Sequence, residues 1–314
     1  MSMANTHQAP LFDRIAIIGH GLIGSSISRA IRRSGNVVGH IAVADMDTTN
    51  RERSLALEIA DSVHADPLKA VAGADCVVLC TPVGTYGALA EQIAPALQPG
   101  AILTDVGSIK CIVSRDIAPH LPAGVHLIPG HPLAGTEKSG PDAGFAEMFE
   151  GRYWVLTPAA NCEPAAIERL TALWQHIGAI VEIMDEEYHD KVLALTSHLP
   201  HLISYTIVGT ATDLEEHMKR DVIRFAASGF RDFTRLAGSN PVMWRDVFLN
   251  NREAVLEMLQ RFQEDLTYLQ RAIRWGDGDT LEKLFTRTRE IRRGVIDAKQ
   301  DIPPHPKEPA PKTD

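Results

Sequence analysis

The sequence predicts an α/β fold, a doubly wound and mostly parallel sheet followed by an all-helical domain. Two patterns carry this prediction. From Arg14 onward, short β-branched runs alternate with helical patterns, which is typical of parallel strands joined by crossover helices. After Asp185 the strand pattern stops, and long amphipathic helical patterns follow. The length of 314 residues also exceeds one average domain.

The predicted strands are apolar runs of the kind that a sheet covered on both faces requires. Four early strands are expected, and three later runs are expected to extend the same sheet, with a helix over residues 163–175 before the last run. The runs are residues 15–18, 38–44, 76–80, 101–104, 125–128, 153–156 and 179–183. We therefore assign residues 12–184 to the sheet domain, after a disordered N-terminus of residues 1–11.

Residues 185–300 are predicted to form a helical substrate and dimerisation domain. Its clearest helix begins at Asn240 and Pro241, a capping residue followed by proline at the first helical position. Apolar side chains then recur every three or four residues from Trp244 to Ile273, with Asn251 as the exception. So long a stripe predicts a homodimer interface; the alternative is packing within its own domain. Residues 301–314, rich in proline, are predicted to be a disordered tail.

Composition excludes several classes of partner. The net charge of −9 argues against nucleic acid, and the four cysteines form no C-x-x-C pair, so no metal is expected. The N-terminus lacks the pattern of a secretory signal, which predicts a cytoplasmic protein. The apolar stretch at residues 199–211 is short and interrupted by polar residues, so no membrane span is expected.

A glycine-rich turn predicts a dinucleotide cofactor. Gly19, Gly21 and Gly24 directly follow an apolar strand and open a helical pattern, which is the context of the dinucleotide-binding fingerprint. Gly19 permits the tight turn, Gly21 lets the backbone approach the pyrophosphate, and Gly24 allows close helix packing. The helix start at Leu22 and Ile23 supplies positive potential to the phosphates.

An acidic residue at the end of the second strand predicts NAD as the cofactor. Asp45 lies about 20 residues beyond the glycines, where a carboxylate accepts hydrogen bonds from the ribose and repels a 2′-phosphate. Asp47 is the competing candidate, and either residue could simply end the strand. Thr81 and Pro82 follow a later strand and are expected to border the nicotinamide half.

Three polar segments predict the catalytic groups: residues 105–110, 130–140 and 196–201. The first two follow predicted strands, so Ser108 and His131 should lie at the carboxyl edge of the sheet, beside the nicotinamide. Oxidation of an alcohol requires a base, and histidine has a suitable pKa. We predict His131 as this base, oriented by Ser108. The alternative is a packing histidine beside Pro132, and Lys110 is interpreted as a solvated helix residue.

The order of five motifs carries a family resemblance. GHGLIG, DVGSIK, GHPLAGTEKSG, LTSHLPH and GFRDFTRLAGSNPVMWRDVF occur in sequence, and over residues 14–297 the chain resembles the prephenate and arogenate (cyclohexadienyl) dehydrogenases of tyrosine biosynthesis. The resemblance implies an NAD-dependent enzyme that oxidises C4 of a cyclohexadienol while the ring carboxylate leaves as CO2. The products would be 4-hydroxyphenylpyruvate or tyrosine.

The resemblance also implies roles for individual residues. His131 would be the base that contacts the ring hydroxyl, with Ser108 as its partner. Arg235 would bind a substrate carboxylate, and its bidentate guanidinium suits that task. His201 would lie near the side-chain carboxylate, with His198 as a less certain second contact.

Further residues are implied at the mouth of the site. Glu137 would pair with the arginine as a gate, with Thr136 beside it. Trp244 would come from the neighbouring subunit; packing within its own helix is the equally weighted alternative. An acidic partner for an amino group, Asp232 or Glu137, would favour arogenate, but the sequence leaves the choice between prephenate and arogenate open.

Two other function classes are weighed against this resemblance. A β-hydroxyacid-type dehydrogenase has the same domain order and employs a lysine on the helical domain, for which Lys191 is the candidate. A non-catalytic NAD-sensing protein would use the same glycine turn, but it would leave Ser108, His131 and Arg235 without a role.

Overall fold

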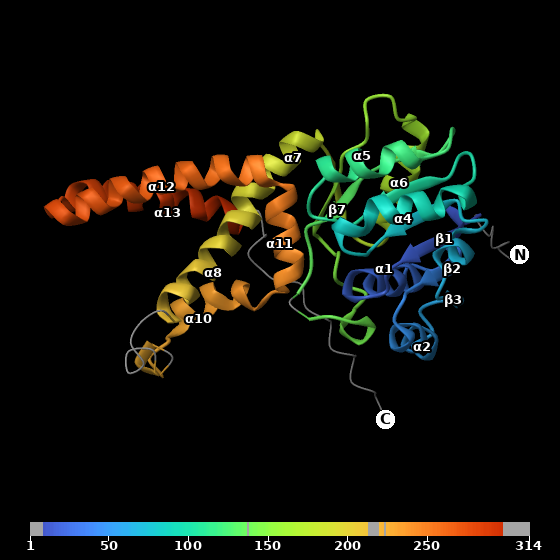
Figure 1. The fold of residues 1–314 in the computed structure, drawn as a ribbon, viewed down its shortest axis with the longest axis horizontal. Coiled ribbons are helices and arrows are strands. Elements are labelled where there is room, and N and C mark those ends of the chain that lie inside the picture. The colour runs from blue at the N-terminus through green and yellow to red at the C-terminus, as the bar shows by residue number, and fades with distance from the viewer. Residues whose placement is uncertain (1–8, 137, 213–219, 223, 298–314) are drawn as a thin grey trace, which may run out of the picture. The chain divides into compact units, whose positions relative to one another are not determined.

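The computed structural model describes residues 9–136, 138–212, 220–222 and 224–297 of the chain. These residues form two compact units, the first ending at His189 and the second beginning at Asp190 (Figure 1). The predicted disordered tail, residues 301–314, and most of the predicted disordered N-terminus lie outside the described residues.

The first unit contains a six-stranded sheet in the order β3-β2-β1-β4-β5-β6, with every neighbouring pair parallel. This is the strand order of the doubly wound dinucleotide-binding fold, so the predicted fold class is confirmed. One short strand, β3, was not predicted, because three residues are too few to show a period of two. The strands are β1 (Phe12–Ile18), β2 (Val38–Ala44), β3 (Ser62–His64), β4 (Cys76–Leu79), β5 (Ile102–Asp105) and β6 (His126–Leu127).

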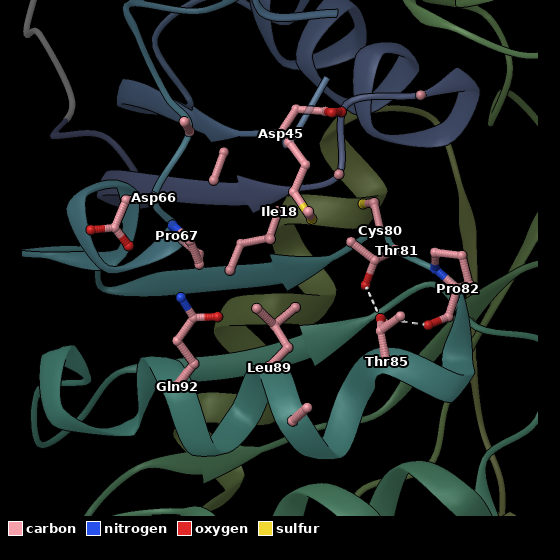
Figure 2. A pocket seen from close by; sticks show the side chains of 16 residues that line it. Ile18, Asp45, Asp66, Pro67, Cys80, Thr81, Pro82, Thr85, Leu89 and Gln92 are labelled. Carbon is pink, nitrogen blue, oxygen red and sulfur yellow. Dashed lines mark hydrogen bonds between the residues drawn. The ribbon is translucent and has the colours of Figure 1, made fainter. Parts of the chain in front are cut away.

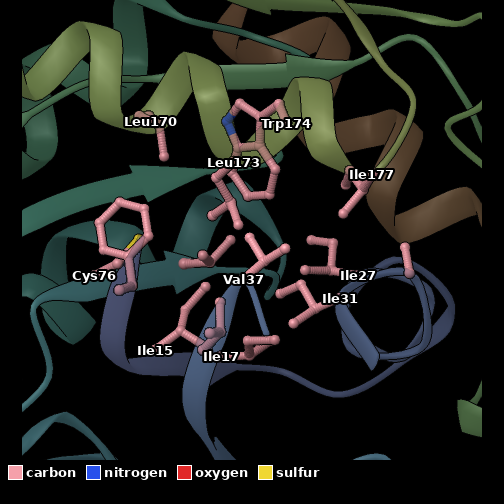
Figure 3. Packing of buried hydrophobic residues seen from close by; sticks show 14 of the residues in the cluster. Ile15, Ile17, Ile27, Ile31, Val37, Cys76, Leu170, Leu173, Trp174 and Ile177 are labelled. Atoms are coloured by element: carbon pink, nitrogen blue, oxygen red, sulfur yellow. The ribbon is translucent and has the colours of Figure 1, made fainter. Parts of the chain in front are cut away.

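Helices follow the strands of this sheet and bury its apolar side chains. In the main core, Ile15 and Ile17 of β1 lie among Ile27 and Ile31 of α1 and Trp174 of α6 (Figure 3). The helices are α1 (Leu22–Arg33), α2 (Thr48–Ala56), α3 (Pro67–Val71), α4 (Tyr86–Ile93), α5 (Cys111–Ile117) and α6 (Pro164–His176), with the short helices η1 (Val83–Thr85), η2 (Ala94–Ala96), η3 (Ala118–His120) and η4 (Pro141–Ala143).

Of the three later runs, residues 125–128 extend the main sheet as predicted, because they contain β6. Residues 153–156 and 179–183 do not extend it, so that part of the prediction is wrong. β8 (Tyr153–Leu156) and β9 (Ile180–Ile183) pair in parallel, and β8 pairs antiparallel with β7 (Gly130–Pro132) in a separate three-stranded sheet. Trp154 of β8 is fully buried and stacks on Trp174, with ring centroids 3.8 Å apart. Apolar periodicity predicts a strand but not its pairing partner, which long-range packing decides.

The second unit is helical, as predicted. Figure 1 shows α12 and α13 as a long pair lying side by side. The elements are α7 (Glu186–Leu193), which runs across the division at His189, the π-helical turn η5 (Ala194–His198), α8 (Leu199–Thr212), α10 (Ser228–Thr234), η6 (Arg235–Gly238), α11 (Pro241–Asn250), α12 (Arg252–Trp275) and α13 (Gly278–Asp297).

The single long helix expected from Asn240 to Ile273 is two helices, so this prediction is also wrong. The predicted start is present, since the Asn240 side chain accepts from the amides of Val242 and Met243. The break comes at Asn251, the one polar exception in the apolar stripe, whose backbone leaves the helical conformation. The Asn251 side chain is buried, and its bonding to other buried groups, described below, replaces the apolar packing that a continuous helix would have there.

The apolar stripe of α12 changes its exposure along the helix. Val255 is buried, Met258 and Phe262 are half-buried, and Leu266 and Ile273 are exposed. The helix ends at Gly276, which adopts the left-handed conformation that favours glycine. The unit's own packing therefore covers the start of the stripe and leaves its end open to solvent.

One helical run in the described residues, Glu186–Ala211, is long and apolar enough to cross a membrane when judged by length and composition alone. A single run of this kind is weak evidence, because core helices of soluble proteins pass the same test. The run also contains two fully buried histidines, His189 and His198. The expectation that the chain has no membrane span stays a prediction.

Candidate functional site

A pocket of about 810 Å³ lies at the carboxyl ends of β1 and β4, where the strand order reverses. Figure 2 shows its lining side chains converging from the sheet edge and from α4. Five predicted cofactor residues line it, namely Gly19, Gly21, Asp45, Thr81 and Pro82. Leu22, Ile23 and Gly24 form the adjoining first turn of α1 rather than the wall.

The glycine turn has the geometry that its sequence predicts. Gly19 has a φ of 90°, and a Cβ there would lie 2.8 Å from the backbone of Cys80. A Cβ on Gly24 would come within 2.3 Å of the Gly19 carbonyl oxygen, so only glycine fits at both positions. At Gly21, by contrast, a Cβ would meet nothing within 4 Å among the described atoms. The open backbone at Gly21 faces space that a ligand can occupy.

The structure separates the two candidate ribose carboxylates. Asp45 lines the pocket, and its oxygens accept from the amides of His20 at 2.8 Å and Asp47 at 2.8 Å, which fix its orientation. Asp47 instead caps α2, accepting from the Thr49 amide at 2.7 Å. The geometry favours Asp45 as a ligand contact, because Asp45 lines the pocket whereas Asp47 is not among the residues that line it.

A buried histidine, His20, hydrogen-bonds residues that flank the glycine turn. His20 is fully buried, with Nδ1 2.6 Å from Ser54 Oγ and Nε2 2.8 Å from Ser28 Oγ. Because the Ser54 hydroxyl donates to the Asn50 carbonyl, Ser54 can only accept from Nδ1–H, and Nε2 accepts from Ser28. Burial lowers the pKa of His20 to about 4. A neutral His20 thus ties the glycine turn to α1 and α2.

Several pocket residues were not predicted. The hydroxyl of Thr85 donates to the Pro82 carbonyl at 2.7 Å and accepts from Thr81 at 2.8 Å, which closes the wall shown in Figure 2. The remaining missed side chains include Met46, Asp66, Pro67, Leu89 and Gln92. Recognition of β3 would have indicated Asp66 and Pro67, since they follow that strand directly.

The interpretation of Lys110 as a solvated helix residue is wrong. Its side chain has no exposed area, and Nζ donates to both Asp105 oxygens, at 2.8 and 2.6 Å, and to the Gly130 carbonyl at 2.5 Å. Asp105 also accepts from the amides of Gly107 at 2.7 Å and Gly130 at 3.0 Å. This buried ion pair therefore joins the loop that contains Ser108 to Gly130, the residue before His131. Ser108 itself is half-buried.

His131 lies on β7 rather than in a loop, opposite Val155 of β8. Its ring is buried, and Nδ1 lies 2.9 Å from Nε2 of His189, a fully buried residue of α7. The two rings meet edge to face, with centroids 5.2 Å apart. His189 was not predicted; its spacing of four residues from the buried Leu193 is the pattern that indicates an inward-facing position.

In the helical unit, His201 and Trp244 form a second cluster. Their rings stack with centroids 3.7 Å apart and an angle of 24°. Nδ1–H of His201 donates to the Ser197 carbonyl at 2.8 Å, which leaves Nε2 as an acceptor in the neutral ring. Burial lowers the pKa of His201, and the positive charge of Arg235 lowers it further. Trp244 is buried within its own chain, and its predicted contribution to a neighbouring subunit stays a prediction.

His198 and Arg235, both predicted to contact substrate, differ in exposure. His198 is fully buried, and its Nδ1 accepts from the Asn251 amide at 3.1 Å, while that amide also donates to the Asp190 carbonyl at 2.9 Å. Its ring lies edge-on to Trp244, so His198 supports the stacked cluster from within. Arg235 begins η6 and is exposed.

The remaining predicted residues lie at the surface or outside the described chain. Thr136 is half-buried and accepts from the Lys138 amide at 3.3 Å, whereas Glu137 lies outside the described residues. Asp232 is exposed and pairs with Arg231 at 3.3 Å, and Lys191 is exposed on α7. Over the described ranges, no group of three His, Cys, Asp or Glu residues could hold a metal ion.

Sequence comparison identifies relatives along nearly the whole chain. Residues 27–183 match the nucleotide-binding domain of prephenate dehydrogenase, and residues 185–287 match its dimerization domain. The chain is 42% identical over 282 residues to a cyclohexadienyl dehydrogenase of Zymomonas mobilis, covering 90% of this chain and 96% of that protein. It is 31% identical over 308 residues to the prephenate dehydrogenase of Bacillus subtilis, covering 94% and 82%.

Solved structures agree with these relatives. The prephenate dehydrogenase of A. aeolicus, in complex with hydroxyphenyl propionate and NAD+, has a TM-score of 0.84 at 30% identity and covers 90% of this chain and 98% of that chain. The arogenate dehydrogenase of Synechocystis has a TM-score of 0.77 at 27% identity and covers 90% and 99%. This chain belongs to the prephenate dehydrogenase family.

Proposed function

We propose that this protein is an NAD-dependent dehydrogenase of tyrosine biosynthesis that oxidatively decarboxylates prephenate, arogenate or both. The products are 4-hydroxyphenylpyruvate and tyrosine, respectively. Two observations carry the proposal in a chain of this family. The chain has a dinucleotide-type pocket, and the Asp105–Lys110 ion pair joins the loop that contains Ser108 to strand β7, which contains His131. Relatives named as prephenate dehydrogenase and as arogenate dehydrogenase support it.

The pocket residues fit NAD. The open backbone at Gly21 and the N-terminus of α1 offer amides to a pyrophosphate. Asp45 would accept the ribose hydroxyls, and its charge disfavours the 2′-phosphate of NADP. The apolar wall from Met46 to Leu89 suits the flat face of an adenine.

In the proposed mechanism, this chain supplies the base and the positioning. NAD, when bound, supplies the hydride acceptor for the hydrogen on C4 of the ring. His131 takes the proton of the C4 hydroxyl, so that the C4–O bond can become a carbonyl. The ring carboxylate then leaves as CO2, and its electron pair enters the ring, which becomes aromatic. The C4 oxygen takes the proton back from His131, so the product is a phenol and His131 is again neutral. Ser108 orients the hydroxyl beside His131.

The helical unit supplies groups suited to the substrate's carboxylates. We assign Arg235 to a carboxylate, which its two-pronged guanidinium can bind with parallel hydrogen bonds. His201, held by Trp244 and the Ser197 carbonyl, offers Nε2 to the substrate side chain. His198 is assigned to the support of this cluster, since it is fully buried. Thr136 and Glu137 keep their proposed roles at the mouth of the site.

The test is a direct assay of purified protein. NADH formation is measured with prephenate and with arogenate, and each reaction is repeated with NADP in place of NAD. We expect turnover of at least one substrate, with NAD preferred over NADP. Absence of turnover with both substrates would overturn the proposed activity, and a preference for NADP would overturn the role of Asp45.

We further propose that the protein is a homodimer formed through the helical unit. Residues 185–287 match a dimerization domain. The exposed end of the α12 stripe, Leu266 and Ile273, and the exposed Phe285 and Ile291 of α13 offer apolar area for a second copy. Light scattering with size-exclusion chromatography should give twice the chain mass of 34.3 kDa; Leu266→Glu with Ile273→Glu should give the single mass.

A cytoplasmic location, with no nucleic-acid or membrane partner, completes the proposal. The relatives carry the names of biosynthetic dehydrogenases, and the net charge of −9 disfavours polyanions. Fractionation of cells that express the chain should recover it with the soluble proteins; recovery in the membrane pellet would contradict this location.

A further inference from the structure

The contact between His131 and His189 carries a further inference. Nδ1 of His131 and Nε2 of His189 are 2.9 Å apart, and both rings are buried. His189 is held in place by α7, whose first turn is anchored because Asp185 accepts from the amides of Glu187 and Tyr188. Glu186 of the same turn hydrogen-bonds Ser114 of α5. His189 is thus a fixed partner for the proposed base.

A contact of this length between two ring nitrogens needs one N–H and one lone pair. Two arrangements satisfy it. If His131 donates from Nδ1, its Nε2 is unprotonated in the neutral ring and can accept a proton. If His189 donates from Nε2, Nδ1 of His131 is the acceptor, and Nε2 of a neutral His131 carries a hydrogen. Only the first arrangement leaves His131 able to act as a base at Nε2.

The same contact limits the charge of the pair. Two protonated rings would place N–H against N–H at this distance, so the pair carries at most one positive charge. When His131 takes a proton at Nε2, its Nδ1–H donates to the neutral His189 as a charge-assisted hydrogen bond, which is stronger than the neutral one. The pairing therefore favours the protonated state that the reaction forms.

The nearby buried ion pair does not replace this function. Lys110 and Asp105 hold the backbone of Gly130, the residue before His131, and so fix the strand. Rotation of the His131 ring and the choice of its protonated nitrogen depend on what the ring itself contacts. His189 makes one such contact, at Nδ1.

We propose that His189 is a positioning residue, which holds His131 as the Nδ1–H tautomer with Nε2 unprotonated. The proposal rests on the proposed function of His131 as the base. A glutamine at position 189 can place its amide oxygen near the position of Nε2 and accept from Nδ1–H, whereas a leucine cannot. The pair of variants therefore separates hydrogen bonding from the filling of space.

The kinetic test compares His189→Leu with His189→Gln, with His176→Gln on the surface of α6 as the control. We expect His189→Leu to lower kcat about 10- to 100-fold with the KM for NAD unchanged, as for loss of a group that assists proton transfer. His189→Gln should retain kcat within about threefold of the wild type. Equal losses in both variants, with equal thermal stability, would overturn the proposal, as would an unchanged kcat in His189→Leu.

A spectroscopic test does not depend on turnover. Nitrogen NMR of histidine-labelled protein at a pH where the rings are neutral, with His131→Gln used to assign the signals, reports which ring nitrogen is bare. We expect a bare Nε2 for His131 in the wild type and in His189→Gln, and a mixture of tautomers in His189→Leu. A bare Nδ1 in the wild type would overturn the proposal. If the wild type turned over neither prephenate nor arogenate, the proposed activity would be wrong. The NMR spectra would still show which tautomer His131 adopts.

Discussion

The two units hold their functional groups in different ways. In the first unit, the backbone and buried charges fix the candidate site: glycines shape the turn, and Asp105 with Lys110 joins the loop of Ser108 to strand β7. In the second unit, side chains on helices do so, since His201 is held by stacking on Trp244 and by one carbonyl.

This difference predicts where each unit is sensitive. The first unit should tolerate few substitutions at these glycines and buried charges. A Cβ at Gly19 or Gly24 would clash with backbone atoms, and an unpaired charge would stay buried. An exposed side chain such as Arg235 should affect binding more than folding when it is removed. The five predictions below test this contrast, from the largest expected effect to the smallest.

Removal of the proposed base should have the largest effect on activity. We expect His131→Ala to lower kcat on the order of 10² to 10⁴-fold, because no other group is assigned to take the hydroxyl proton. Steady-state kinetics with the preferred substrate give the value, and NAD binding should be retained. A kcat equal to that of the wild type would remove His131 from the role of base.

Breaking the buried ion pair should have the largest effect on stability. We expect Lys110→Met to lower the free energy of unfolding by about 3–5 kcal/mol, because it leaves the Asp105 carboxylate buried without its counter-charge. Urea denaturation measures the change, and Lys191→Met, at an exposed lysine, is the control. Adding Asp105→Asn to Lys110→Met should recover part of the loss; a further full loss would argue against an uncompensated charge as the cause.

Acidification should destabilise the turn through His20. Its folded pKa of about 4 lies below the unfolded value of 6.5, so the unfolded chain binds more protons between these values. The contribution of neutral His20 is fully present above pH 6.5 and decreases as the pH falls toward 4, by about 3 kcal/mol in total.

The measurement is urea denaturation at several pH values between 4 and 8, for the wild type and for His20→Asn. The variant should be less stable at pH 8, and the difference from the wild type should shrink toward pH 4. Parallel curves for the two proteins would show that His20 does not titrate in this range.

In the helical unit, loss of the proposed carboxylate partner should act on substrate binding. We expect Arg235→Ala to raise the substrate KM about 10- to 100-fold with a small change in kcat, since a hydrogen bond to a charged group contributes about 1.5–3 kcal/mol. Arg231→Ala, at the exposed ion pair with Asp232, is the matched control. Equal KM changes in both variants would point to a general charge effect.

The smallest effect concerns cofactor choice. We expect Asp45→Ala to reduce the preference for NAD over NADP by about tenfold, through loss of a ribose contact and of charge repulsion. Asp47→Ala removes a helix cap and should cost about 1 kcal/mol of stability with no change in preference. If the preference moved with Asp47 rather than Asp45, the assignment would be reversed.

Much of the site could be read from the sequence where chemistry is local. The glycine spacing requires a specific turn, and the structure shows the contacts that forbid a Cβ at Gly19 and Gly24. Asp45 and Asp47 could not be separated, because both end the same strand, and only their hydrogen bonds show that one is a cap. Lys110 was misjudged because a buried lysine depends on a partner that the surrounding residues provide.

The sequence by itself determined the order of elements, the doubly wound sheet and the cofactor turn, because local periodicity and glycine geometry encode them. Only the tertiary structure decided which strands share a sheet, where α11 gives way to α12, and that His189 contacts His131. These features depend on contacts between residues far apart in the chain, and such contacts leave no local pattern. A histidine 58 residues away in the sequence thus lies 2.9 Å from a ring nitrogen of the proposed base.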